Sequence, residues 1–168
     1  SKGGRMRASR PTDADSEARR LVHDYADLIL RLSYTYLNST CDAEDVCQDV
    51  LLKTLARTVP FAGTEHEKAW IIRVTINACK DRLKQGRGRF VSLDEARYAE
   101  APGHPHDETL EAVQKLQLIY REAIYLHYYE GYSIAEIARM TDRSESAVGA
   151  ALSRGRKKLR AMLERSAS

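Results

Sequence analysis

Four polar residues lie at helical spacing and could contact nucleic acid. They are Arg73, Asn77, Lys80 and Lys84. Steps of three or four residues place them on one face of a predicted helix. Cations neutralise phosphates, and an asparagine amide can both donate to and accept from a base edge. Trp70 and Asp81 border this polar stripe, and an indole ring can stack on an unpaired base. An isolated stripe is more often a solvated helix face, so the rest of the chain must decide its meaning.

The last 35 residues have the pattern of a helix-turn-helix, whose second helix enters the DNA major groove. A capping box opens a predicted helix over 133–140, and Ser144 caps a second over 145–164. Five basic residues and no acid lie between Arg154 and Arg160, more than one helix end needs to complement its dipole. This segment is therefore predicted to bind DNA phosphates.

A third surface is acidic and lies on the helix predicted over 42–57, with Asp42 as its N-cap. Opposite the apolar side of this helix stand Asp45, Gln48, Asp49 and Leu52. A leucine among carboxylates suits a protein partner with a basic surface. Single exposed leucines are common, so the simpler interpretation is a solvated face.

The elements that must position these residues are all helical. Apolar residues follow a helical period from Leu21 to Tyr36, and a third helix is predicted over 67–85. Glycines, prolines and little apolar periodicity over 86–107 predict a flexible linker. The chain thus reads as an all-α protein of two small helical domains, residues 16–85 and 108–165.

Composition narrows the class of protein. The net charge of +3 is small, but acids and bases are grouped in separate blocks, which suggests separate partners. No apolar run approaches the roughly 20 residues of a membrane span, and no signal-peptide pattern appears. Three cysteines without CxxC spacing argue against a disulfide framework and favour a reducing cytoplasm. The residues before Met6 are interpreted as an expression remnant.

Catalysis and cofactor binding find no support in the sequence. There is no βαβ pattern, no glycine-rich phosphate loop and no nucleophile–base pair, so we expect neither an enzyme nor a cofactor. A metal site at His104, His106 and Asp107 is conceivable, but two histidines in a polar linker are usually solvated. Cys47 and Cys79 fall on predicted core faces, which leaves Cys41 as the candidate for an exposed thiol.

Several segments, in this order, resemble the extracytoplasmic-function (ECF) group of bacterial sigma factors. DAEDVCQDVLL (42–52) resembles the DAED-x-x-Q-[ED] helix of the group, and AWIIRVTINACKD (69–81) resembles its A-W-L-x-R-I-A-x-N-x-x-x-D helix. YREAIYLHYYEGYSIAEIA (120–138), SESAV (144–148) and LSRGRKKL (152–159) are similar to its fourth conserved region. SLDE (92–95) resembles a linker motif. The resemblance covers about residues 16–165.

The resemblance implies a role for each surface. Asp45, Gln48, Asp49 and Leu52 correspond to the surface that binds the clamp helices of the largest polymerase subunit. Phe61, Gly63 and the loop to His66 correspond to the loop that accepts a flipped base of the minus-ten element. Arg73, Asn77 and Asp81 correspond to positions along the helix that faces the melted strand, and Trp70 corresponds to its edge. By the same resemblance, the second domain would bind the flap of the second-largest subunit and the minus-thirty-five duplex. An anti-sigma factor between the two domains is also implied, as is transcription of stress- or envelope-responsive genes.

Two departures from the family pattern carry predictions. Gly149, Ala150 and Ala151 replace the long polar side chains usual there, so we expect contacts mainly to phosphates and DNA shape. The residues expected at the duplex are Arg143, Ser144, Ser146, Ser153, Arg154 and Lys157. Gln117 replaces a frequent proline, so the helices on either side are expected to run together.

The main alternative is a helix-turn-helix regulator that binds duplex DNA alone and uses its N-terminal half to bind other proteins. It explains the C-terminal segment equally well and residues 61–85 poorly. A serine recombinase with a similar C-terminal motif lacks support in the sequence.

Overall fold

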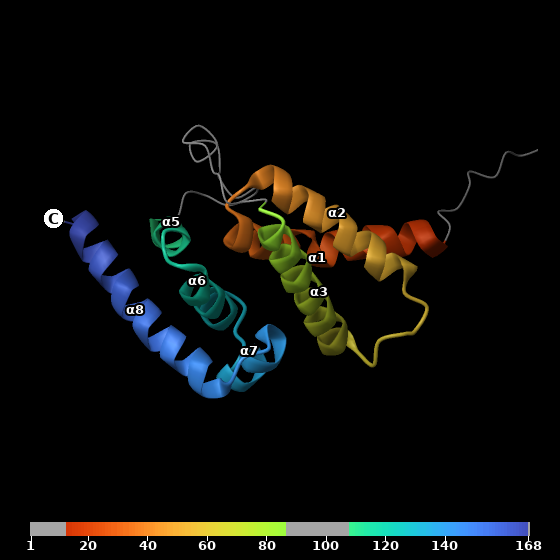
Figure 1. Ribbon diagram of the computed structural model, residues 1–168. Coiled ribbons are helices and arrows are strands. Elements are labelled where there is room, and N and C mark those ends of the chain that lie inside the picture. Colours follow the sequence, from red (N-terminus) through yellow and green to blue (C-terminus); the bar gives the residue numbers. More distant parts are fainter. Residues whose placement is uncertain (1–12, 87–107, 168) are drawn as a thin grey trace, which may run out of the picture.

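The computed structural model describes residues 13–86 and 108–167, and every regular element within them is a helix. In chain order these are α1 (Asp13–Leu37), α2 (Thr40–Ala56), α3 (Thr64–Lys84), α5 (Glu108–Gln114), α6 (Leu118–Ile124), the π-helix η1 (Tyr125–Tyr129), α7 (Ile134–Thr141) and α8 (Glu145–Ala167) (Figure 1). None of these helices is long and apolar enough to cross a membrane. The predicted all-α fold with a helix-turn-helix is confirmed. The motif at 92–95 and the conceivable metal ligands at 104–107 lie outside the described residues.

Helices α1, α2 and α3 form the first group. The predicted apolar stripe of α1 is buried throughout, at Leu21, Tyr25, Leu28, Ile29, Leu32 and Tyr36. Burial of each such side chain contributes about 1.5–3 kcal/mol relative to exposure. Cys47 of α2 and Cys79 of α3 lie in this core, and Cys41 is exposed, as predicted. Burial raises the thiol pKa of Cys47 to about 11 and that of Cys79 to about 12.

The ends of α2 differ from the prediction. Ser39, rather than Asp42, is the N-cap, because its Oγ accepts a hydrogen bond of 3.2 Å from the backbone N–H of Asp42. Asp42 lies in the first turn, where a carboxylate still complements the helix dipole. Leu55, near the other end of α2, is 37% exposed because it borders a cleft beside the loop 57–63.

Helix α3 begins three residues earlier than predicted, at Thr64. Its buried face consists of Ile71, Ile72, Thr75, Ile76 and Cys79. The Thr75 hydroxyl donates to the carbonyl of Ile71 at 2.7 Å, which satisfies a polar group inside the core. Glu67 lies in the first turn of α3 and is buried against α1.

The second group contains α5 to α8. Helices α5 and α6 do not run together, contrary to the expectation drawn from Gln117. Gln117 is extended, with φ −60° and ψ 148°, and precedes α6 without a side-chain cap. The helical segment that begins with α6 ends at Tyr129, just before Gly131, whose φ of +77° suits a residue without Cβ.

The helix-turn-helix consists of α7 and α8. Both hydrogen bonds of the predicted capping box at Ser133 and Glu136 are present. Asp142 turns the chain with a left-handed backbone, and Ser144 Oγ accepts from the N–H of Ala147 at 3.0 Å. Helix α6 approaches α8 closely at Gly155, where an added Cβ would lie 2.8 Å from Ile124 Cδ1.

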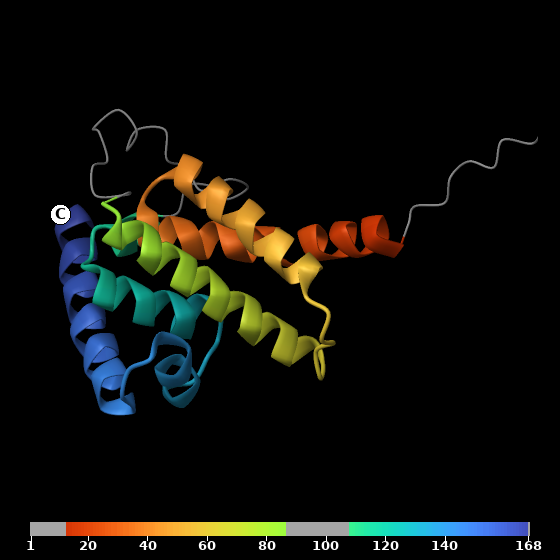
Figure 2. The same ribbon diagram turned by 45° about the vertical axis from the view of Figure 1, so that its right-hand side comes forward.

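The two groups pack directly against each other. Helix α6 contacts α1, α3 contacts α7, and α6 lies between α8 and the first group in both views (Figures 1 and 2). At one point of this contact, Lys68 Nζ lies 3.6 Å from Glu130 Oε2. The sequence predicted two domains joined by a linker and gave no indication of this contact.

Candidate nucleic-acid interface

The residues of the polar stripe on α3 differ in their exposure to solvent. Arg73, Asn77, Asp81 and Lys84 are exposed. Lys80 is only 32% exposed at its side chain, and its Nζ lies 3.4 Å from the carbonyl oxygen of Thr141. Most of the stripe therefore faces solvent, while Lys80 is directed toward the second group.

An aromatic cluster stands at the start of the stripe. The rings of Phe61 and Trp70 lie 5.5 Å apart, and the guanidinium of Arg57 lies 4.2 Å from the Phe61 centroid and 5.0 Å from that of Trp70. His66 packs edge-on against Phe61, and its Nδ1 accepts a hydrogen bond from the N–H of Ala62. Such cation–π contacts contribute about 0.5–1 kcal/mol at exposed sites. The loop that carries Phe61 is thus held against α3 beside the polar stripe.

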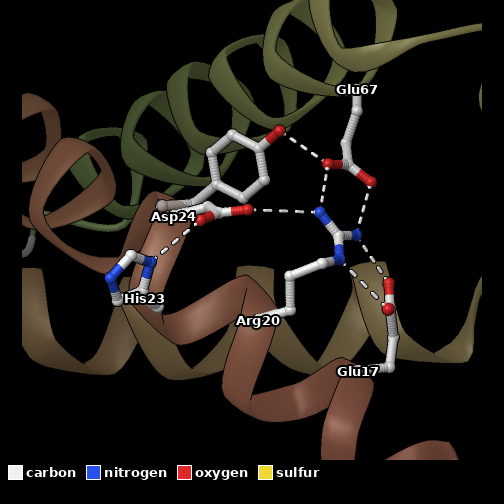
Figure 3. A network of polar contacts seen from close by, with 6 residues as sticks. Glu17, Arg20, His23, Asp24 and Glu67 are labelled. Atoms are coloured by element: carbon white, nitrogen blue, oxygen red, sulfur yellow. Dashed lines mark hydrogen bonds and ion pairs between the residues drawn. The ribbon is translucent and has the colours of Figure 1, made fainter.

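An open cleft of about 490 Å³ lies beneath this loop. Phe61 and Gly63 line one side, and Arg20 with Glu67 line the other. Figure 3 shows Arg20 between the carboxylates of Glu17 and Glu67. The hydrogen bonds from Arg20 lower the pKa of Glu67, against the opposing effect of its burial, so the carboxylate is ionised at neutral pH. Phe61 and Gly63 of the loop thus share the lining of this cleft with the paired side chains of Arg20 and Glu67.

The acidic face of α2 is exposed as predicted. Asp45, Gln48 and Asp49 are exposed, and Leu52 is 58% exposed among them. Arg82 of α3 reaches this face, 3.8 Å from Asp45 and 3.3 Å from Asp49. These distances suit ion pairs that hold the two carboxylates in a row, with Leu52 one turn further on.

On the helix-turn-helix, the side chains of Ser146, Ser153, Arg154 and Lys157 are exposed along α8. Ser144 is occupied as the helix cap. The guanidinium of Arg143 lies 3.4 Å from a carboxylate oxygen of Glu122, a buried residue of α6. The predicted duplex-binding residues are thus exposed along the first part of α8, except that Ser144 caps the helix and Arg143 turns inward.

Comparisons with known proteins match both halves of the chain. The Sigma-70 region 2 family matches residues 21–89, and the Sigma-70 region 4 family matches residues 106–159. The ECF RNA polymerase sigma factor SigM of Mycobacterium tuberculosis is 31% identical over 137 residues, which are 79% of this chain and 70% of SigM. The chain belongs to the ECF sigma factors of RNA polymerase. It is therefore a promoter-recognising subunit of that enzyme, and the region 2 match does not favour the stand-alone regulator.

Other relatives agree with this family and fold. SigV of Bacillus subtilis is 27% identical to this sigma factor over 146 residues, covering 84% of this chain and 88% of SigV. The sigma factor RpoE, in its complex with the anti-sigma factor NepR from Bartonella quintana, superposes with a TM-score of 0.66 at 22% identity. That alignment covers 87% of this chain and 95% of RpoE. CnrH, in its complex with the cytosolic domain of CnrY, superposes with a TM-score of 0.61 at 23% identity. That alignment covers 90% of this chain and 95% of CnrH.

Several residues that shape the interface of this sigma factor were missed in the sequence. They are Arg20, Tyr25, Arg57, Glu67, Arg82, Arg121 and Glu122. For two of them a signal was present: Glu67 lies four residues before Ile71, and Glu122 lies four before Leu126. A charged residue on the apolar face of a helix indicates a buried ion pair. Its partner could not be identified, because the partner comes from a distant part of the chain.

Proposed function

We propose that α3 and the loop 57–63 bind the opened strand of the minus-ten element. The observation that carries this proposal is that the exposed side chains of Arg73 and Asn77 continue directly from the Phe61–Trp70 aromatic pair. This arrangement joins stacking, base-edge hydrogen bonding and phosphate binding in one line, as single-stranded nucleic acid requires. Removing a base from its stack costs a few kcal/mol, which the cleft beneath Phe61 would offset.

The helix-turn-helix is proposed to bind the minus-thirty-five duplex through Ser146, Ser153, Arg154 and Lys157. Ser144 fixes the start of α8. Arg143 joins the DNA contacts after it is released from Glu122. Its middle offers Gly149 and Ala150 rather than long polar side chains. Phosphate contact then supplies most of the affinity, and the shape of the duplex supplies the preference.

Two surfaces are proposed for core polymerase. The exposed row of Asp45, Gln48, Asp49 and Leu52 on α2 is assigned to the clamp helices of the largest subunit. An apolar groove of about 640 Å³ between η1 and the last turns of α8 is assigned to the flap of the second-largest subunit. Tyr128 and Tyr129 line this groove and are 51% and 41% exposed, as apolar contact with a partner requires.

We propose two domains on this basis. Residues 16–85 bind the minus-ten strand and the clamp helices, and residues 108–165 bind the minus-thirty-five duplex and the flap. The protein is proposed to act without catalysing a reaction itself, in the cytoplasm where polymerase and promoter DNA are found. An anti-sigma factor is proposed as a further partner, since RpoE is seen in complex with the anti-sigma factor NepR.

Run-off transcription with core polymerase tests the proposal, on promoters of the source organism beginning with the one upstream of this gene. Transcripts should depend on both core enzyme and this chain. Specific promoter binding by the chain without core enzyme, combined with no transcript in its presence, would instead support the stand-alone regulator.

A further inference from the structure

Helix α6 carries two adjacent charged residues that are buried. Arg121 is 9% exposed and Glu122 is 2% exposed. Arg121 donates to a carbonyl of α1 and also, at 2.8 Å, to the carbonyl of Leu116 in its own group, while Glu122 accepts a hydrogen bond from Tyr36 of α1. Charged groups are rarely buried without partners. The partners of Arg121 and Glu122 therefore show what holds the two groups of helices together.

Arg121 closes the C-terminal end of α1. Its Nε donates to the carbonyl of Thr35 at 2.8 Å, and its Nη2 donates to that of Tyr36 at 3.3 Å. The last four carbonyls of a helix have no partner within the helix, and the helix dipole favours a cation there. The last turn of α1 contains no basic residue of its own. The second group therefore supplies the cation that this helix end lacks.

Glu122 collects donors from both groups. The hydroxyl of Tyr36 donates to its carboxylate. Lys80 Nζ lies 4.0 Å from the carboxylate, and Arg143 Nε lies 3.4 Å from it. Lys80 belongs to the stripe assigned to the minus-ten strand, and Arg143 belongs to the helix-turn-helix assigned to the minus-thirty-five duplex. One buried carboxylate thus lies within ion-pair distance of a cation from each surface assigned to DNA.

The packed arrangement is too short to reach both promoter elements. About 25 base pairs separate the two elements, roughly 85 Å of duplex at about 34 Å per turn of ten base pairs. A compact chain of 168 residues has a radius of gyration of only about 15 Å, so its extent falls well short of this separation. Contact between α3 and α7 also places the two DNA-binding surfaces next to each other. The groups must separate before both elements can be bound.

We propose that Arg121 and Glu122 form a latch that holds this sigma factor closed and competes with DNA phosphate for Lys80 and Arg143. The proposal rests on the DNA-binding roles assigned above. The closed and open forms are in equilibrium, and polymerase with promoter DNA selects the open one. The latch therefore lowers the affinity of the free chain for DNA.

Two variants with opposite changes in charge test the latch. Glu122→Gln keeps the shape of the side chain and raises the net charge by one. Arg121→Gln removes the cap on α1 and lowers the net charge by one. A purely electrostatic effect would move DNA affinity in opposite directions, whereas the latch predicts tighter binding by both. Asp27→Asn and Arg19→Gln, at exposed positions of α1, are the matched charge controls.

The measurements are small-angle scattering and affinity for a minus-thirty-five duplex, both on the free full-length chain. The wild type should scatter near the radius of gyration of about 15 Å that scaling gives for a compact chain of 168 residues. Both latch variants should be larger, and each should bind duplex at least about fivefold more tightly than its charge control. An extended wild type would overturn the proposal even if a variant failed to fold. Folded variants with unchanged scattering and affinity would also overturn it.

Transcription with core polymerase separates this proposal from the one on which it rests. If the wild type directs transcription but the latch variants behave like their controls, only the latch is wrong. If the wild type fails to direct transcription while the variants expand, the competition with DNA is wrong and Arg121 and Glu122 remain a purely structural contact.

Discussion

Arg20 of α1 donates two hydrogen bonds of 2.8 Å to the carboxylate of Glu67 in the first turn of α3 (Figure 3). Tyr25 donates a third, at 2.6 Å, to the same carboxylate. Bidentate pairs between guanidinium and carboxylate fix orientation as well as adding energy. This pair therefore sets where α3 begins, and with it the position of the loop that carries Phe61.

The Arg20–Glu67 pair predicts a dependence of stability on pH. The pKa of Glu67 is lowered from 4.5 on folding, so the pair contributes above about pH 4.5 and its contribution is lost as pH falls through the lower, folded value. Glu67→Gln should lower the free energy of unfolding at pH 7 by about 2 kcal/mol, since a charged hydrogen-bond partner is lost. Urea unfolding at pH 7 and pH 3 should show this difference shrinking as pH falls. A difference that is constant with pH would contradict the assignment.

Substitution of glycine by alanine should have opposite effects on stability at two positions of α8. Gly149 has open space around it, since an added Cβ would lie 4.0 Å from Ile134 Cδ1, so Gly149→Ala should raise stability by about 1 kcal/mol through helix propensity. At Gly155 an added Cβ would also lie 3.1 Å from Tyr120 Cβ, in the contact between α6 and α8. Gly155→Ala should lower stability, since overpacking costs about 1–3 kcal/mol. Thermal unfolding of the two variants checks this, and equal shifts of Tm would refute the close approach.

Gly149 and Ala150 also predict weak base readout at the minus-thirty-five element. Scrambling the bases of this duplex should cost less than about 2 kcal/mol of binding free energy, because a lost base contact typically costs about 1–3 kcal/mol. Affinity should instead fall steeply with salt, as phosphate contacts require. Titrations of the holoenzyme with native and scrambled duplexes measure both quantities. A larger loss on scrambling would show that other residues read bases.

The sequence was sufficient to predict most of the helices and the core of α1, and the exposure of most, though not all, of the proposed contact residues. Periodicity located the core of α1, and capping residues located the start of α7, because both depend on neighbours within a few positions. The start of α2 was misplaced because Ser39 and Asp42 are both acceptable caps, and only the backbone distinguishes them.

Contacts between distant segments could not be predicted in this way. Arg121 meets Thr35 across 86 positions, and Glu122 meets Tyr36 across the same separation. Nothing local to either partner identifies the other. For the same reason, the sequence did not show that Lys80 is directed toward Thr141 in the second group. Its spacing is equivalent to that of the other three residues of the stripe.

The central claim is that the exposed edge of α3 contacts an opened DNA strand. Promoter opening by holoenzyme containing the double variant Arg73→Ala and Asn77→Ala tests it most directly, with Arg19→Ala as the control and binding to core polymerase measured in parallel. With core binding unchanged, the double variant should open promoters at least about tenfold less well, which corresponds to a loss of about 1.4 kcal/mol. Promoter opening equal to that of the wild type would contradict the claim.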